Sequence, residues 1–569
     1  MSTKGSTPSS TSWKIVVLVI GAATLVVLGP LIFHGIPATR DFLEHLHIAV
    51  AFFKSMSVGD LMPSWPADVN GGYGDVSVRI YPPGLSILWA AARLLTGSWY
   101  LASVAVFGLL TFAGGIGTWL WAREFTPSKY AVWAGALFIL TPYHVTELFT
   151  ASLLAEYAAV CVLPFAFAFS ERICRSGTKR EVACLGAAYA LLVLFNLPLT
   201  VIGSYSLLLY FVVTVDRSRI LESSLKFASG LSLGLLCSVF YWVTVVAELP
   251  WMRPDTEHPF SSINFVFATL RQNAQDSGVA FANLILLTTL AILIPAAVLV
   301  SGKLRDENKK LIWAVGSVTL VAFFMSTLPS YPLWFILPKL KEVQLPWRWL
   351  AVGSIGAPVL LAASIPAWRR IFFGKQQWLA LIAIGFVLVP VAFSISHPIR
   401  ETRYLSRSEI QTLSLNVVGT ATIGQWFPFW ARGEPTEMPE EAVAEGRQII
   451  LKHWSPEHRS YAISEGAGSE VRIRTYYYPL WVATASGQKL PTHPASDGAL
   501  LITVPSQAVS FDLDFREPPR AFVSSVVSIV ASLLLLALAV PGGRKGRNIS
   551  IKTPVSVDET PSPDIAEIP

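Results

Sequence analysis

Residues 15–33 read IVVLVIGAATLVVLGPLIF, a run of 19 residues without a charged side chain. A helix needs about 20 apolar residues to cross the hydrocarbon core of a bilayer. The run therefore predicts a membrane-spanning helix. Lys14 precedes it, as in a signal peptide, but no convincing small-x-small cleavage site follows, and we interpret it as an uncleaved anchor.

Similar runs recur along the chain of 569 residues. Of all residues, 53% are hydrophobic and 14% are charged, whereas soluble domains have about 25% charged residues. We place twelve spans, near residues 15–33, 99–122, 130–143, 150–171, 181–196, 197–215, 224–247, 280–300, 309–327, 347–366, 377–395 and 521–540. The sequence thus predicts a polytopic α-helical membrane protein with about 12 transmembrane helices. A soluble enzyme and a disordered or collagen-like chain are excluded.

Basic residues predict the orientation of these spans, because Lys and Arg concentrate in short cytoplasmic loops. Residues 171–180, 216–219 and 302–305 are rich in them, whereas the alternate connections near 144–150 and 196–198 have none. We therefore expect both termini in the cytoplasm and the protein in the plasma (inner) membrane. Residues 542–569, rich in Ser, Thr, Pro and acids, are expected to form a disordered cytoplasmic tail.

Two regions on the outer side are too long to be simple connections. The first outer loop covers 34–98 of a transmembrane domain, 1–396, and an extracytoplasmic domain covers 397–520, before the final helix at 521–541. Within the latter, the runs 471–478, 499–504 and 509–515 alternate apolar and polar residues, which is typical of half-buried strands. We expect a small β-sandwich with one helix near 438–453.

The first outer loop contains an acidic and histidine-bearing segment. Read as a helix, it places Asp41, Glu44 and His45 on one face, so that an amphipathic helix on the membrane surface presents a carboxylate to a cleft. An alternative is a helix N-cap by Asp41 with Glu44 as its partner, without catalysis. A zinc pair of His45 and His47 is less favoured, because residues i and i+2 of a helix point apart.

The rest of the loop contains Asn70-Gly-Gly-Tyr-Gly-Asp75 and Arg79-Ile-Tyr81-Pro-Pro-Gly84. The glycines permit sharp turns, and the prolines can start a helix at 84–95 that is too short to span a bilayer. This segment is either a structured turn or a surface that grips a ligand at the outer interface.

Two further charged residues belong to predicted spans. Glu156 is expected about two turns below the outer end of span 150–171, either as a functional acid or paired with a Tyr, His144 or a backbone group. Arg348 is expected at the outer edge of span 347–366. It either extends to lipid headgroups or holds a lipid phosphate with two hydrogen bonds.

Taken together, these motifs resemble those of a bacterial membrane-protein family labelled 6-pyruvoyl-tetrahydropterin synthase related, which is similar to GT-C glycosyltransferases. The resemblance is carried by Asp41-x-x-x-His45, Tyr73-Gly74…Tyr81-Pro-Pro83, Leu153-Leu-Ala-Glu156 and Gln344-Leu-Pro-Trp347-Arg348. The sandwich motifs Tyr476-Tyr-Tyr-Pro-Leu-Trp481, Asp497-Gly498 and Val504-Pro505 resemble the C-terminal sandwich of related glycosyltransferases. Nothing in the sequence suggests a soluble zinc pterin enzyme.

The resemblance implies a lipid-phosphate sugar donor and transfer on the outer face, with a first-loop acid at the active centre. It makes Asp41, with Glu44 and His45, the catalytic candidates. The substrate-binding candidates are Arg79, Tyr81, Glu156, Trp347 and Arg348, and the two arginines would supply charge for the leaving phosphate. In GT-C enzymes the acid often has a second acid two residues on, which this sequence lacks, so the need for a divalent cation is left open.

The leading hypothesis is therefore a membrane glycosyltransferase that uses a polyprenyl-phosphate sugar. Its expected partners are a glycan, lipid or protein acceptor and membrane lipids, but no nucleic acid. The alternatives are a transporter or flippase of lipid-linked substrates and a non-catalytic glycan-binding membrane scaffold. The scarcity of ionisable residues inside the predicted spans disfavours transport.

Overall fold

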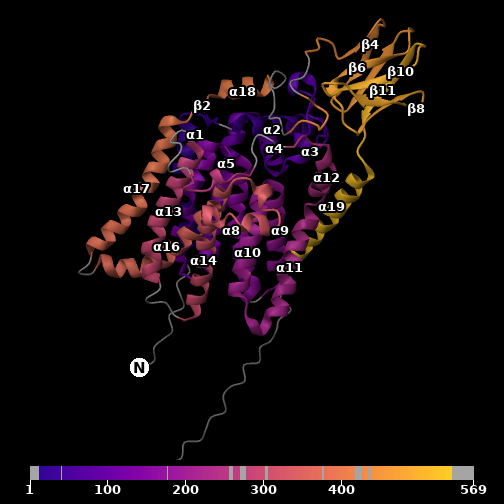
Figure 1. The fold of residues 1–569 in the computed structure, drawn as a ribbon. Coiled ribbons are helices and arrows are strands. Elements are labelled where there is room, and N and C mark those ends of the chain that lie inside the picture. Colours follow the sequence, from indigo (N-terminus) through magenta and orange to yellow (C-terminus); the bar gives the residue numbers. More distant parts are fainter. Residues whose placement is uncertain are drawn as a thin grey trace, which may run out of the picture.

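The computed structural model describes residues 12–540 except 40, 176, 255–259, 269–276, 301–305, 374–376, 417–425 and 433–436. Within these residues the chain forms a bundle of long helices, and a β-sandwich stands at one end of the bundle (Figure 1). The predicted cytoplasmic tail, 542–569, lies outside the described residues.

Eight helices in the described part of the chain are long and apolar enough to cross a membrane. They are α1 (Trp13–Phe33), α5 (Trp99–Ala122), α8 (Leu154–Arg175), α10 (Leu197–Thr214), α11 (Ile220–Cys237), α16 (Leu350–Phe372), α17 (Gln377–Glu401) and α19 (Pro519–Ala539). Four further predicted spans correspond to α6 (Ser128–Ile139), α9 (Lys179–Phe195), α13 (Ser277–Val300) and α14 (Asp306–Ser326). Of these, α6 and α9 have only 12 and 17 residues, so the count of 12 crossings stays a prediction.

The predicted span 224–247 is divided in the structure. Helix α11 ends at Cys237, and α12 (Val239–Glu248) begins after Ser238. The Ser238 hydroxyl donates to the carbonyl of Gly234, which competes with the regular helical hydrogen bonds at this point.

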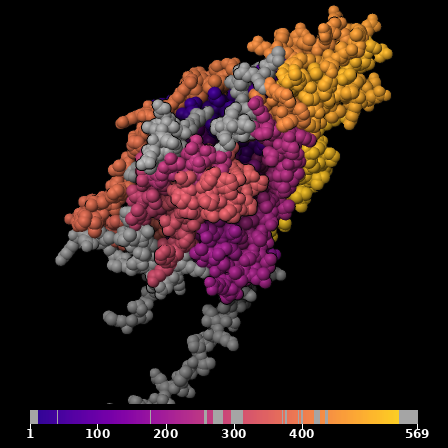
Figure 2. Space-filling model, in the orientation of Figure 1, coloured from indigo at the N-terminus to yellow at the C-terminus, as the bar shows by residue number. Residues whose placement is uncertain are grey.

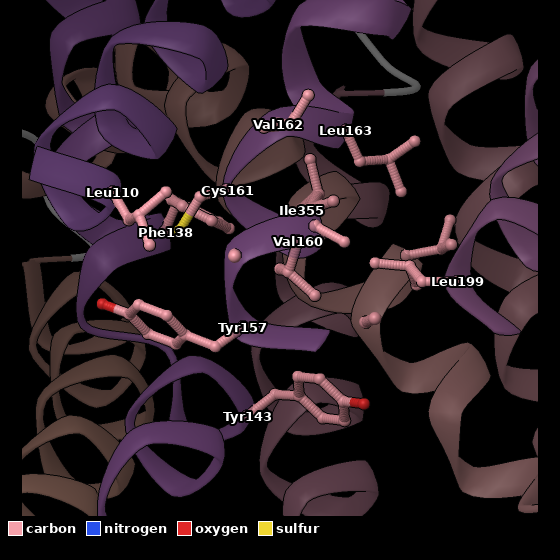
Figure 3. Packing of buried hydrophobic residues seen from close by; sticks show 14 of the residues in the cluster. Leu110, Phe138, Tyr143, Tyr157, Val160, Cys161, Val162, Leu163, Leu199 and Ile355 are labelled. Atoms are coloured by element: carbon pink, nitrogen blue, oxygen red, sulfur yellow. The ribbon is translucent and has the colours of Figure 1, made fainter. Parts of the chain in front are cut away.

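Helix α8 lies at the centre of the bundle. Every residue from Leu154 to Pro164 is buried, as expected of a helix that is surrounded by other helices rather than by lipid. Figure 3 shows side chains of this helix meeting those of four neighbouring helices: Tyr157, Val160, Cys161, Val162 and Leu163 with Leu110, Phe138, Leu199 and Ile355. The N-terminal end of α8 carries Glu156, so a helix buried among its neighbours positions this acid.

The first loop covers the end of the bundle on which the sandwich stands (Figure 1). It forms α2 (Phe42–Ser57), α3 (Ser77–Ile80) and α4 (Gly84–Thr96), and β1 (Ile36–Pro37) pairs with β2 (Tyr404–Leu405). The predicted helix at 84–95 is confirmed as α4. Most residues of α2 are buried, including Leu46, His47 and Ala49, whereas Asp41 and Glu44 are half-buried. The burial arises because α4 and α18 (Arg407–Leu415) pack against the helix.

The sandwich consists of two antiparallel sheets. One has the order β3 (Ala442–Ala444), β6 (Ser469–Tyr476), β10 (Ala499–Val504) and β9 (Thr492–Pro494). The other has the order β4 (Ile449–Trp454), β5 (His458–Ile463), β11 (Val509–Phe515), β7 (Trp481–Ala485) and β8 (Gln488–Leu490). The strands predicted at 471–478, 499–504 and 509–515 are confirmed.

The helix predicted near 438–453 is wrong, because this segment contains β3 and β4. Its glutamates and alanines have good helix propensity. However, β3 pairs with β6, and β4 pairs with β5. Strand pairing with partners that are distant in sequence thus overrides the local preference.

The sandwich shares its core with the first loop. Trp65, Tyr73 and Val76 belong to the same buried cluster as Tyr476 and Trp481. In addition, the Tyr476 backbone N–H donates to the carbonyl of Tyr73 at 3.0 Å. The segment 397–520 therefore does not contain the whole of this core, and its independence as a domain stays a prediction.

Candidate active site

A cavity of about 480 Å³ lies where the first loop, the start of α8 and the segment before α16 meet. Six predicted site residues line it: Asp41, Glu44, His45, Tyr81, Glu156 and Arg348. Other lining residues include Ile80, Asn196, Val201, Val245, Lys339, Gln344 and Trp426. In Figure 2 the indigo surface of the first loop is set back behind the residues around it on this face. The fold thus brings together motifs as far apart in the sequence as Asp41 and Arg348.

Asp41 stands at the N-cap position of α2, but its side chain makes no capping hydrogen bond. Asp41 thus occupies the predicted N-cap position, but its carboxylate does not cap the helix. Glu44 lies in the first turn of the same helix and lines the same cavity. Two carboxylates from one helical turn thus face the cavity.

His45 is buried beside these acids. Burial lowers the pKa of His45 to about 4, although a hydrogen bond with the Ser152 backbone opposes this change. Its ring contacts Tyr81, with 5.6 Å between the ring centres. The imidazole is consequently neutral at pH 7. His47, the other member of the less favoured zinc pair, is not part of the cavity wall.

Glu156 pairs with Arg348 in the wall of the cavity. Arg348 Nε lies 2.9 Å from Glu156 Oε2, and the Tyr143 hydroxyl donates to Glu156 Oε1 at 2.6 Å. Arg348 Nη1 also donates to the Val343 carbonyl at 2.9 Å. The guanidinium is therefore directed at an acid of the bundle, and not extended along the lipid interface.

The depth predicted for Glu156 is wrong. Helix α8 begins at Leu154, so Glu156 lies in its first turn and not two turns inside a span. The residues before it form a short π-helical turn, η2 (Glu147–Ala151), and Ser152 has a φ of 50°. The positive end of the α8 dipole stabilises a carboxylate at this position.

Sequence analysis missed a second buried acid behind the pair. Glu147 is 1% exposed. Burial and the negative charge of Glu156 hold the pKa of Glu147 well above its ordinary value, and Tyr143 hydrogen-bonds to it. In the sequence, Glu147 is only an acid in the predicted connection near 144–150, which has no Lys or Arg. This pattern gives no reason to expect that the acid is buried.

Arg79 and Trp347 do not line the cavity. Arg79 Nε and Nη2 donate to the two carboxylate oxygens of Glu248 at 2.6 and 2.7 Å, and Glu517 accepts two further hydrogen bonds from Arg79. The Trp347 ring lies near Tyr143, with 6.4 Å between the ring centres. Arg79 is thus neutralised in an ion-pair network, and Trp347 lies behind the cavity wall.

Three residues with a positive φ other than glycine lie around the site: Ser152, Lys339 and Gln344. Such strained conformations cluster at functional sites, where the surroundings enforce them. The Ser152 hydroxyl lies 2.9 Å from the Thr39 hydroxyl, which fixes the chain two residues before Asp41. Within the described residues, no group of three His, Cys, Asp or Glu side chains is placed to hold a metal ion.

Comparison with known families gives one match over most of the helical region. Residues 78–401 match the family described as 6-pyruvoyl-tetrahydropterin synthase related domain, a membrane protein. No curated protein matches the chain by sequence.

Among solved structures, the fold of the chain is similar to those of AftD, ArnT and an archaeal oligosaccharyltransferase. Arabinofuranosyltransferase AftD from Mycobacteria is 15% identical, with a TM-score of 0.44 over 68% of this chain and 27% of AftD. ArnT from Cupriavidus metallidurans is 16% identical, with a TM-score of 0.42 over 71% and 78% of the two chains. The Archaeoglobus fulgidus oligosaccharyltransferase is 11% identical, with a TM-score of 0.43 over 76% and 62%. The chain therefore spans only about a quarter of the length of AftD.

Proposed function

The chain belongs to the membrane-protein family described as 6-pyruvoyl-tetrahydropterin synthase related, and we propose that it is a glycosyltransferase. It moves a sugar from a polyprenyl-phosphate donor to an acceptor on the extracytoplasmic face of the plasma membrane. The observation that carries this proposal is the single cavity that holds the carboxylates of Asp41 and Glu44 together with the guanidinium of Arg348.

The basic side of the cavity suits the phosphate of the donor. Arg348 is a fixed cation in a largely buried wall, where an ionic hydrogen bond to a developing phosphate charge is worth more than in water. Before the donor binds, Glu156 balances this charge. Leu197, Val201 and Val245 add an apolar surface from α10 and α12, against which the first isoprene units of the lipid can pack.

The acidic side suits activation of the acceptor. A hydroxyl oxygen of the acceptor attacks the anomeric carbon, and its proton passes to the Asp41 carboxylate. The bond between the anomeric carbon and the phosphate oxygen breaks, and the lipid phosphate leaves with the electron pair. His45 stays neutral, because its pKa is about 4, and it keeps Tyr81 and α2 in place through the ring contact and the Ser152 bond.

The location of the cavity supports the outer face as the site of transfer. The cavity lies at the end of the bundle that carries the first loop and the sandwich (Figure 1). The basic loops 171–180 and 216–219 follow the opposite ends of α8 and α10. By the positive-inside rule, those ends face the cytoplasm.

The test is transfer from synthetic polyprenyl-phosphate hexoses and pentoses by the full chain in lipid nanodiscs. Asp41→Asn removes the proton acceptor but keeps a good N-cap residue, so we expect a folded protein whose transfer rate falls by at least about 10²-fold. Asp60→Asn is the matched control, because Asp60 lies in the same loop and outside the cavity.

Normal transfer by Asp41→Asn would remove the general base from the proposal. If the wild-type chain transferred no sugar from any donor but moved the lipids across the bilayer, the transporter alternative would replace it.

A further inference from the structure

Gln344 is the centre of a strained turn in the cavity wall. Its φ of 64° and ψ of −49°, together with a hydrogen bond of 2.7 Å from the Leu345 N–H to the Val343 carbonyl, define a γ-turn with positive φ. This form of the γ-turn is rare and strained. A glycine would adopt it without the strain that a Cβ brings.

The surroundings enforce this conformation. Val343 on one side and Pro346 and Trp349 on the other are buried. The Val343 carbonyl that closes the turn also accepts the hydrogen bond from Arg348 Nη1 at 2.9 Å. The turn therefore fixes Arg348 and, in the same step, places Gln344 in the cavity wall. The turn needs only the backbone of Gln344, and the residue adds a carboxamide to the cavity wall that also holds Arg348.

We propose that the Gln344 carboxamide binds hydroxyl groups of the donor sugar, next to the phosphate that Arg348 holds. This inference rests on the proposed function. A carboxamide both donates and accepts hydrogen bonds, as a sugar hydroxyl does. It is also uncharged, so it neither competes with Arg348 for the phosphate nor neutralises the acids across the cavity. Gln344 is thus a residue for sugar specificity.

The test separates the side chain from the turn. Gln344→Gly keeps the positive φ and removes the carboxamide, and Gln344→Asn keeps an amide but shortens its reach by one methylene. Donor KM, kcat and Tm are measured for each variant. Dissociation constants are also measured by tryptophan fluorescence for two probes: polyprenyl phosphate alone and the polyprenyl-phosphate sugar that the wild type uses best.

We expect Gln344→Gly to raise the donor KM and weaken binding of the sugar-bearing lipid by about 10-fold, the effect of one or two neutral hydrogen bonds. Binding of the sugar-free lipid phosphate should be unchanged, and Tm should stay within about 2 °C of the wild type. The donor KM of Gln344→Asn should lie between those of the wild type and Gln344→Gly. This variant should also change the order in which the protein prefers donor sugars.

Ser486→Gly is the matched control. Ser486 also has a positive φ, of 50°, but lies in the turn between β7 and β8 of the sandwich. It should change neither KM nor lipid binding. Equal losses for both lipids in Gln344→Gly would show that the turn acts only through Arg348, and wild-type kinetics would show that the side chain has no role; either result overturns the inference. A wild type that transfers no sugar would instead overturn the proposed function.

Discussion

Two buried arginine–glutamate pairs among the described residues, Arg79–Glu248 and Arg348–Glu156, differ in their surroundings. Arg79 and Glu248 are 4% and 0% exposed, and Glu517, Arg520 and Tyr478 complete their hydrogen bonds. This network has two arginines and two glutamates, so its charges balance. It joins the first loop, α12, the sandwich and the start of α19.

The pair of Arg348 and Glu156 is open by comparison. Its arginine is 12% exposed and lines a cavity. The charges of both members act on a further buried acid, Glu147. A closed network stabilises a junction, whereas a pair at a cavity wall can exchange its partner for a ligand. The proposed function therefore gives Arg348 the contact with the donor phosphate and Arg79 a structural role, although the sequence motifs included both.

The largest effect is expected from breaking the closed network. Arg79→Met leaves Glu248 and Glu517 with one arginine fewer, and removal of one member of a buried ion pair costs about 3–5 kcal/mol. We expect a marked loss of stability and protease cleavage between the sandwich and the bundle, measured by unfolding in detergent and limited proteolysis. If Arg79→Met were as stable as the wild type, the network would not hold this junction.

Arg348→Met should have the reverse profile. Loss of a cation that stabilises a leaving phosphate typically costs about 10²–10³-fold in rate. Stability should suffer less than in Arg79→Met, because Glu156 can take up a proton at the cavity wall. Arg348→Lys keeps the charge but loses the planar fork, so partial transfer with weaker donor binding is expected. Transfer assays and donor titration of both variants, beside Arg79→Met, distinguish the two pairs.

Low pH should destabilise the cavity end of the bundle. Burial lowers the pKa of His45 and His47 to about 4, against about 6.5 in an unfolded chain. Between pH 6.5 and 4 the unfolded chain thus binds protons that the folded chain excludes. Stability should fall as the pH falls through this window, by up to about 3 kcal/mol per histidine, and stay constant above it.

The measurement is the free energy of unfolding against pH for the wild type and His45→Gln. The variant should lose part of this pH dependence. His493→Gln is the control, because its histidine lies on the sandwich and is 41% exposed; the part of the pH dependence that His45→Gln removes should remain in this variant. An unchanged slope in His45→Gln would mean that His45 has the same pKa in the folded and the unfolded chain.

Sequence reasoning predicted the helical spans and grouped Asp41, Glu156 and Arg348, which line one cavity, because hydropathy and short motifs are local signals. It could not place Arg79 outside this cavity, since the partners of this residue are 169 and 438 positions away. It missed Glu147, because the turn that buries this acid interrupts an apolar run that otherwise suggests one continuous span. Tertiary contacts determine the surroundings of Arg79 and Glu147, and the hydropathy pattern of the sequence does not reveal such contacts.

The smallest effect is expected from Glu156→Gln. Glutamine keeps the size of the side chain. Its one carbonyl oxygen can accept from Arg348 while its NH2 group donates to the Tyr143 hydroxyl, but without a negative charge it no longer competes with the donor phosphate for the guanidinium. Donor KM should therefore fall by about 2–10-fold, the range of one hydrogen bond, with little loss of stability because glutamine fills the same volume and keeps both hydrogen-bonding contacts. Glu248→Gln, the same change in the closed network, should reduce stability and leave KM unchanged. A higher donor KM in Glu156→Gln would mean that Glu156 positions Arg348 for the phosphate, and the two pairs would then share a purely structural role for their acids.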